Sequence, residues 1–79
     1  MKMTPEDFKV VRDAIVPLLT APEHHNLWAN YKAKGLSKQR FCWDTLWASK
    51  LNIQSLYSYL NDANITTALM KICEPYMVD

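Results

Sequence analysis

The chain has 79 residues, 49% of them hydrophobic, and a net charge of +1 at pH 7. This length fits one domain, and this apolar fraction is too high for a disordered segment. No apolar run approaches the roughly 18 residues needed to cross a bilayer, and residues 1–5 contain no signal-peptide core. Membrane and secreted proteins are therefore not expected, and we predict a cytoplasmic protein.

The sequence contains a single glycine, Gly35, and only four prolines, which leaves long stretches without turn signals. This pattern favours helices over strands. We predict an all-α fold, a compact bundle of about five short helices that forms one domain over residues 1–79, with a fraying tail at 76–79. Because so small a domain has a limited core, a homodimer and a monomer are both consistent with the sequence.

The first helix is predicted to start after Thr4, whose side chain can cap it, with Pro5 at its first position. Pro17 lacks a backbone donor, so this helix is expected to end near Val16 or to kink there. Its apolar stripe consists of Phe8, Val11, Ile15, Leu18 and Leu19.

The second helix is predicted to start at Pro22, with Thr20 or Ala21 as its cap. It should end at Gly35, because glycine readily adopts the left-handed conformation that terminates helices. Its buried face is expected to consist of Leu27, Trp28 and Tyr31.

The third helix is predicted to follow Ser37 as its cap and to end at the break formed by residues 51–52. Its apolar positions are Phe41, Cys42, Leu46, Trp47 and Leu51.

A short fourth helix is expected through Ile53, Leu56, Tyr57 and Leu60. The fifth should be capped by Asp62 or Asn64 and stopped by Pro75, with a stripe formed by Ile65, Ala68, Leu69 and Ile72. The predicted core consists of Phe8, Val11, Ile15, Leu19, Leu27, Phe41, Leu46, Trp47, Ile53, Leu56, Leu60, Leu69 and Ile72.

Residues that could carry catalysis or bind a metal are few. His24 and His25 are adjacent, so on a helix they diverge by about 100° and cannot easily share one metal ion. Cys42 and Cys73 lie on apolar stripes, which predicts reduced thiols that fill core space. We expect no enzyme, no catalytic residue, no metal and no cofactor.

Positive charge is concentrated in residues 31–51, which carry a net charge of +4, while the remainder carries −3. The proposed binding residues in this segment are Lys34, Lys38, Arg40, Trp43 and Lys50. The segment resembles a helix-turn-helix, which favours a small DNA- or RNA-binding regulator as the alternative function. Against this, Tyr31 is bulky where that motif wants a small residue, and an ordinary solvated face of lysines also explains the pattern.

Arg40, Trp43 and Trp47 have the spacing i, i+3 and i+7, so they can share one helical face with the composition of an interface hot spot. Trp47 is expected in the core, while Trp43 fits the core and a contact surface equally well. Asp44 lies four residues after Arg40 and can pair with it.

Part of the C-terminal half shows a recognisable pattern. Its residues are Gly35, Ser37, Arg40, Trp43, Asp44, Leu46, Ala48, Leu51, Leu56 to Asp62, Ile65, Thr67, Ala68, Leu69 and Ile72. This pattern resembles small, mostly uncharacterised accessory proteins that phages and prophages of enteric bacteria encode. The resemblance implies a setting and transfers no catalytic or ligand-binding residue.

These observations lead to a functional expectation. We expect a phage or prophage accessory protein that binds and modulates a host macromolecule, namely a host protein, with anti-defence activity as one form of this role. The alternative is the nucleic-acid-binding regulator that uses residues 31–51. A dense acidic surface is absent from the sequence, which disfavours DNA mimicry.

Overall fold

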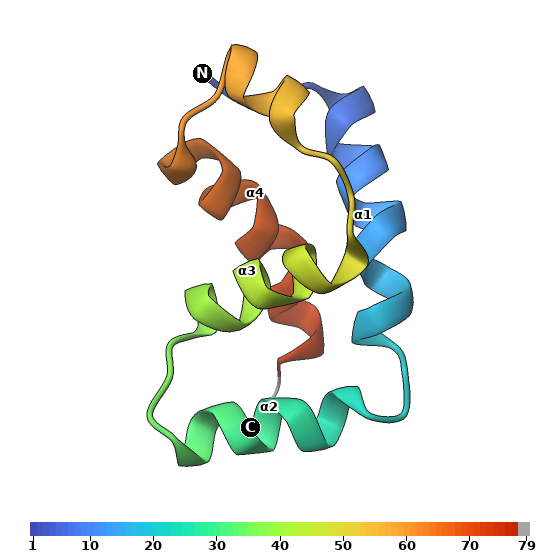
Figure 1. The fold of residues 1–79 in the computed structure, drawn as a ribbon, viewed down its shortest axis with the longest axis vertical. Helices are drawn as coiled ribbons and strands as arrows, with labels where there is room; N and C mark the ends of the chain where they lie inside the picture. The colour runs from blue at the N-terminus through green and yellow to red at the C-terminus, as the bar shows by residue number, and fades with distance from the viewer. Residues whose placement is uncertain (78–79) are drawn as a thin grey trace.

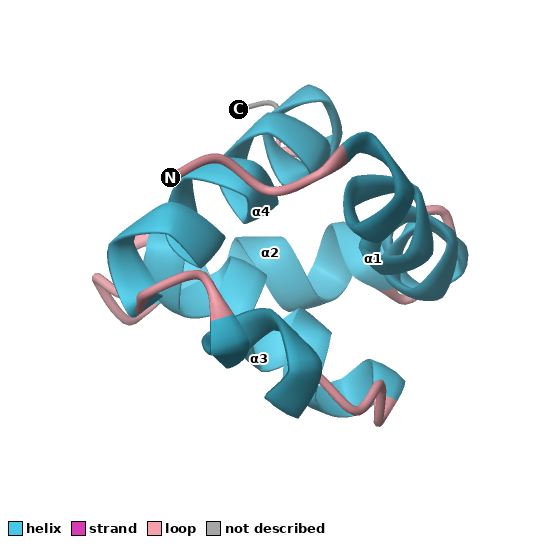
Figure 2. Cartoon of the chain, turned by 90° about the horizontal axis from the view of Figure 1, so that it is seen from above, coloured by secondary structure: helices cyan, strands magenta, loops and turns pink. Residues whose placement is uncertain are grey.

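The computed structural model describes residues 1–77, and all regular elements in this range are helical (Figures 1 and 2). The α-helices are α1 (Pro5–Leu19), α2 (His24–Ala33), α3 (Lys38–Ser49) and α4 (Asp62–Cys73). Two short 3-10 helices, η1 (Gln54–Ser58) and η2 (Glu74–Tyr76), complete the fold. The all-α prediction is confirmed, but the bundle contains four α-helices because the expected fourth helix is the 3-10 segment η1.

Three helices form the body of the molecule, and the fourth lies across one end. α3 packs against α4 and α1, and α1 also packs against α4. The backbone of α2 lies farther from the others and crosses the end of the molecule opposite η1 (Figure 1). The resulting shape measures 35 × 22 × 19 Å.

The start of α1 follows the prediction, and its end does not. The hydroxyl of Thr4 accepts a hydrogen bond from the backbone N–H of Asp7, as a cap should. However, the helix continues through Pro17 to Leu19. Pro17 lies on the exposed side, where water can satisfy the carbonyl that loses its donor, whereas Leu19 is buried, which favours a further helical turn.

The start of α2 was predicted two residues too early, because residues 20–23 form a turn. Its end was predicted correctly. Gly35 adopts a φ of +72°, its N–H bonds to the carbonyl of Lys32, and the N–H of Leu36 bonds to that of Tyr31. This pair of bonds is a Schellman motif, which satisfies carbonyls that the helix end would otherwise leave without donors.

Ser37 caps α3 as predicted, by accepting from the N–H of Arg40. The helix ends at Ser49, and the next residue, Lys50, adopts a left-handed φ of 60°. Such a conformation costs a residue with a Cβ about 1–2 kcal/mol.

Replacing Lys50 by glycine should therefore raise the free energy of unfolding by about 1 kcal/mol, since glycine adopts this conformation without the Cβ penalty. Urea denaturation measures the change. Lys50→Ala serves as the control because alanine keeps the Cβ, and an equal gain in this variant would show that backbone strain at position 50 is not the cause.

The last helix differs from the prediction at its start and agrees with it at its end. The cap of α4 is Asn61, one residue earlier than expected, and it exchanges hydrogen bonds with Asn64 in a capping box. α4 ends at Cys73, before Pro75. Tyr76 and Met77 contact the rest of the molecule: the Tyr76 carbonyl is hydrogen bonded to His24, and Met77 is buried. The predicted fraying of residues 78–79 lies outside the described residues.

Most of the predicted core is confirmed, with two clear errors. Leu27 is 49% exposed and Trp47 is 57% exposed, while Phe8 is half-buried against the core. The buried residues of α2 are His24 and Trp28, because the side of the helix that carries Leu27 faces solvent. Both thiols are buried and free, as predicted. The core also includes Ile65, Ala68, Cys42, Cys73 and Met77.

Candidate functional site

The exposed face of α3 carries the residues that the sequence singled out as a hot spot. The buried residues of this helix are Phe41, Cys42, Thr45 and Leu46. At about 100° per residue, Trp47 lies roughly 170° from the centre of this buried face, next to Arg40. An indole on the side of the helix opposite the core does not contribute to the core, so its presence there needs another explanation.

The two indoles of α3 lie against each other. Their ring centroids are 5.7 Å apart with an interplanar angle of 31°. Trp43 is half-buried, and its indole N–H donates to the hydroxyl of Thr66 at 2.9 Å, which ties it to α4. Trp47 rests on this fixed ring with most of its own surface in solvent.

These rings form one wall of a hollow of about 460 Å³ between α3, η1 and the start of α4. We call it the aromatic hollow, and its lining consists of Arg40, Trp43, Asp44, Trp47, Tyr57 and Asp62. Tyr57 is 45% exposed, and its hydroxyl donates a hydrogen bond to the carboxylate of Asp62 at 2.8 Å. Three aromatic rings and two carboxylates thus meet on one surface.

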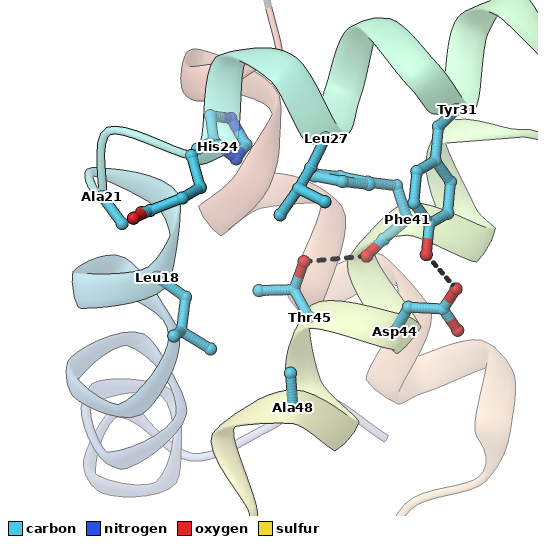
Figure 3. Close-up of a pocket in the computed structure, with 10 residues that line it drawn as sticks. Leu18, Ala21, His24, Leu27, Tyr31, Phe41, Asp44, Thr45 and Ala48 are labelled. Atoms are coloured by element: carbon cyan, nitrogen blue, oxygen red, sulfur yellow. Dashed lines mark hydrogen bonds between the residues drawn. The ribbon is translucent and has the colours of Figure 1, made fainter.

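A second hollow of about 220 Å³ lies on the other side of α3, beneath α2 (Figure 3). We call it the apolar hollow, and its lining consists of Leu18, Ala21, Glu23, His24, Leu27, Tyr31, Phe41, Asp44, Thr45 and Ala48. Thr45 does not offer its hydroxyl proton to this space, since it donates to the carbonyl of Phe41 at 2.9 Å.

Phe41 forms the base of the contact between α2 and α3. The rings of His24, Trp28 and Tyr31 lie 5.3, 5.4 and 4.8 Å from its ring centroid. A nitrogen of His24 also contacts the carbonyl of Tyr76 at 2.7 Å, which joins η2 to the same cluster. His24 is therefore both packed and hydrogen bonded, while His25 is exposed.

Asp44 lines both hollows and holds their common wall. Its Oδ2 accepts from the phenol of Tyr31 at 2.5 Å and lies 3.5 Å from Nε of Arg40, so the predicted pair of Arg40 and Asp44 is confirmed. The hydrogen bond to the Asp44 carboxylate raises the pKa of Tyr31, and burial raises it further. A hydrogen bond to Asp62 raises the pKa of Tyr57 in the same way.

A raised pKa in the folded state means that Tyr31 stabilises the fold below pH 10.0, its ordinary pKa, and that this contribution is lost as pH rises through the folded pKa. The difference in unfolding free energy between the native chain and Tyr31→Phe should therefore be constant up to about pH 9 and shrink above pH 10. Urea denaturation at pH 8 and pH 11 tests this, and a difference that is unchanged or larger at pH 11 would contradict it.

No protein-family model, curated protein or solved structure matches the chain.

Two further findings concern residues 1–77 alone. They contain no group of three or more histidine, cysteine or acidic side chains that could hold a metal ion. None of their helices is long and apolar enough to cross a membrane. The side chains of Cys42 and Cys73 are fully buried, and the thiol of Cys42 donates to the sulfur of Met70 at 3.6 Å. The interaction with Cys42, together with burial, raises the pKa of Cys73, and the same interaction lowers the pKa of Cys42. A buried thiol with a raised pKa is a poor nucleophile.

The structure brings together only two of the five predicted binding residues, Arg40 and Trp43. Lys34 follows the end of α2, and Lys38, at the start of α3, points about 160° away from Arg40 around the helix. Lys50 lies beyond the other end of α3, roughly 18 Å from Lys38 along the helix axis. The lysines therefore do not form one face with Arg40.

Sequence reasoning missed Tyr57 and Asp62 as members of the site. Tyr57 was assigned to the apolar stripe of a helix, and Asp62 to a helix cap. Their spacing of five residues, with a phenol preceding a carboxylate across a turn, is a weak signal that becomes meaningful only once α3 is known to lie beside them.

Proposed function

We propose that this chain is an accessory protein of a phage or prophage that binds and modulates a host protein in the cytoplasm, and that the partner docks on the aromatic hollow. The observation that carries the proposal is the exposure of Trp47, 57% of whose surface faces solvent on the side of α3 opposite the core. Burying such a ring against a partner is strongly favourable, since aromatic side chains contribute the largest apolar areas at interfaces.

The neighbours of Trp47 support this role. Arg40 and Tyr57 lie beside it, and Trp, Tyr and Arg are the residue types most enriched at interface hot spots. The ring of Trp43 beneath it is anchored by Thr66, so little order has to be gained on binding. A rigid aromatic patch of this kind is typical of a preformed docking surface.

Nucleic-acid binding is the alternative function, and the charges of the aromatic hollow argue against it. Asp44 and Asp62 line the same surface as Arg40, so phosphates would meet two carboxylates and one cation there. A surface that offers stacking rings without a gathered set of cations favours a protein partner.

Replacing Trp47 by alanine should abolish partner capture without unfolding the chain. The immobilised chain is incubated with lysate of an enteric bacterium, and captured proteins are quantified by mass spectrometry. Capture of the partner should fall more than about tenfold, since hot-spot residues contribute about 2 kcal/mol or more. The proposal predicts retained capture for Leu27→Ala, which removes an exposed apolar side chain at the other hollow.

Charge reversal separates the two faces of α3. Arg40→Glu should alter capture, whereas Lys34→Glu and Lys38→Glu should leave it unchanged, because only Arg40 lines the aromatic hollow. A gel shift with duplex and single-stranded probes at low salt tests the alternative. The proposal would be overturned if the chain bound these probes with an affinity that falls steeply as salt rises, and if Trp47→Ala captured host protein as well as the native chain does.

A further inference from the structure

The aromatic hollow carries more acidic than basic groups, although it lies in the most basic segment of the chain. Asp44 and Asp62 line it together with a single cation, Arg40. That cation already has a partner, since its Nε lies 3.5 Å from Oδ2 of Asp44. The carboxylate of Asp62 therefore gives the opposite side of the hollow, near Tyr57, a net negative charge.

The hydrogen-bond donors of the hollow are largely engaged within the protein. The indole N–H of Trp43 donates to Thr66, and the phenol of Tyr57 donates to Asp62. Trp47 and Tyr57 are 57% and 45% exposed, so their rings are accessible, and Asp62 still has a second carboxylate oxygen. Ring faces and carboxylate oxygens both attract cations, the former through the negative charge of the π system.

We propose that the aromatic hollow receives a cationic side chain, arginine or lysine, from the partner protein, with the cation between Trp47, Tyr57 and Asp62. This inference rests on the proposed function, since it names the chemistry that the docking surface recognises. Aromatic faces combined with a carboxylate are the usual means of binding guanidinium and ammonium groups at protein surfaces. An acidic or phosphorylated segment would instead meet two carboxylates.

The scaffold of the hollow fixes this arrangement before binding. The hydroxyl of Thr66 accepts from Trp43 and donates to the carbonyl of Asp62, so a chain of hydrogen bonds links α3 to the first turn of α4. The bond from Tyr57 to Asp62 adds η1 to the same network. These hydrogen bonds between α3, η1 and α4 therefore hold the rings of Trp43 and Tyr57 and the carboxylate of Asp62 in place.

Titration of the isotope-labelled chain with N-acetyl-arginine methylamide tests the chemistry directly. The indole N–H signals of Trp43 and Trp47 should shift and saturate in the millimolar range, which is typical of a single weak contact. N-acetyl-citrulline methylamide has nearly the same shape without the charge and should cause no saturable shift. The lysine analogue forms a third arm that identifies the preferred cation. Equal shifts with citrulline, or shifts confined to other residues, would overturn the inference.

Asp62→Asn should weaken binding of the arginine probe by about threefold to tenfold, and Asp62→Glu should restore it. Asp13→Asn, which removes an exposed carboxylate on α1, is the matched control, and circular dichroism verifies the fold of each variant. An Asp62→Asn variant that binds the probe as tightly as the native chain would contradict the inference.

Capture of the host partner distinguishes this inference from the proposed function. Loss of capture in both Trp47→Ala and Asp62→Asn supports both. Loss in Trp47→Ala with full capture in Asp62→Asn leaves the docking surface in place and rejects the cationic ligand. Full capture in both variants rejects the docking surface, and the titration with the arginine probe then decides whether the hollow binds cations on its own.

Discussion

Replacing Phe41 by alanine is expected to release α2 from the rest of the molecule. Phe41 is 3% exposed, and three rings of α2 pack around it, those of His24, Trp28 and Tyr31. Truncation of a buried phenylalanine costs about 3–5 kcal/mol. Because the backbone of α2 lies far from the other helices, the side-chain contacts around Phe41 hold α2 in place. Loss of these contacts should leave α1, α3 and α4 packed against one another.

Hydrogen exchange measures this release residue by residue. Amides of α2 should lose protection in Phe41→Ala, while those of α4 should retain most of theirs, as expected for a unit that opens locally. Phe41→Leu is the matched control, since it keeps an apolar side chain and should cost far less. Equal loss of protection in α2 and α4 would show instead that the molecule unfolds as one unit.

The sequence was sufficient for the parts of the fold that local signals specify. Thr4, Ser37 and Gly35 were assigned correctly as helix caps and terminator because each acts on backbone groups within a few residues. The apolar stripe of α4 was also correct, because this helix has one clearly hydrophobic side. The stripe of α1 was correct for Val11, Ile15 and Leu19, whereas Leu18 is exposed.

The errors on α3 arose because apolar character was taken as burial. Thr45 is buried, since its hydroxyl is satisfied by the carbonyl of Phe41 within the same helix. Trp47 is exposed, although it is the more hydrophobic of the two. The strongest evidence for a docking surface is therefore Trp47, a hydrophobic residue at an exposed position. Its exposure becomes apparent only from the packing of α3 between α1 and α4.

Other features depend on contacts between distant segments. His24 meets the carbonyl of Tyr76 across 52 residues, and Tyr59 bonds to Thr4 and Asp7 across a similar separation. No local pattern encodes such pairs. The same holds for the aromatic hollow, whose walls come from α3, η1 and α4.

Leu69→Ala should destabilise the whole molecule, in contrast to the local effect expected at position 41. Leu69 is fully buried on α4, which packs against both α1 and α3. Truncation of a buried leucine costs about 2–5 kcal/mol, and a domain of this size has a total stability of about 4–12 kcal/mol. The melting temperature should fall by about 10 °C or more, with amides of α1, α3 and α4 losing protection together.

Leu27→Ala makes the same chemical change at a residue that is 49% exposed, so it removes a similar side chain without opening a cavity in the core. Its cost should stay below about 1 kcal/mol, as is usual for surface substitutions. The sequence assigned both leucines to the core, and the structure separates them. Equal losses of stability in the two variants would mean that α2 packs its Leu27 side inward, which would also close the apolar hollow beneath it.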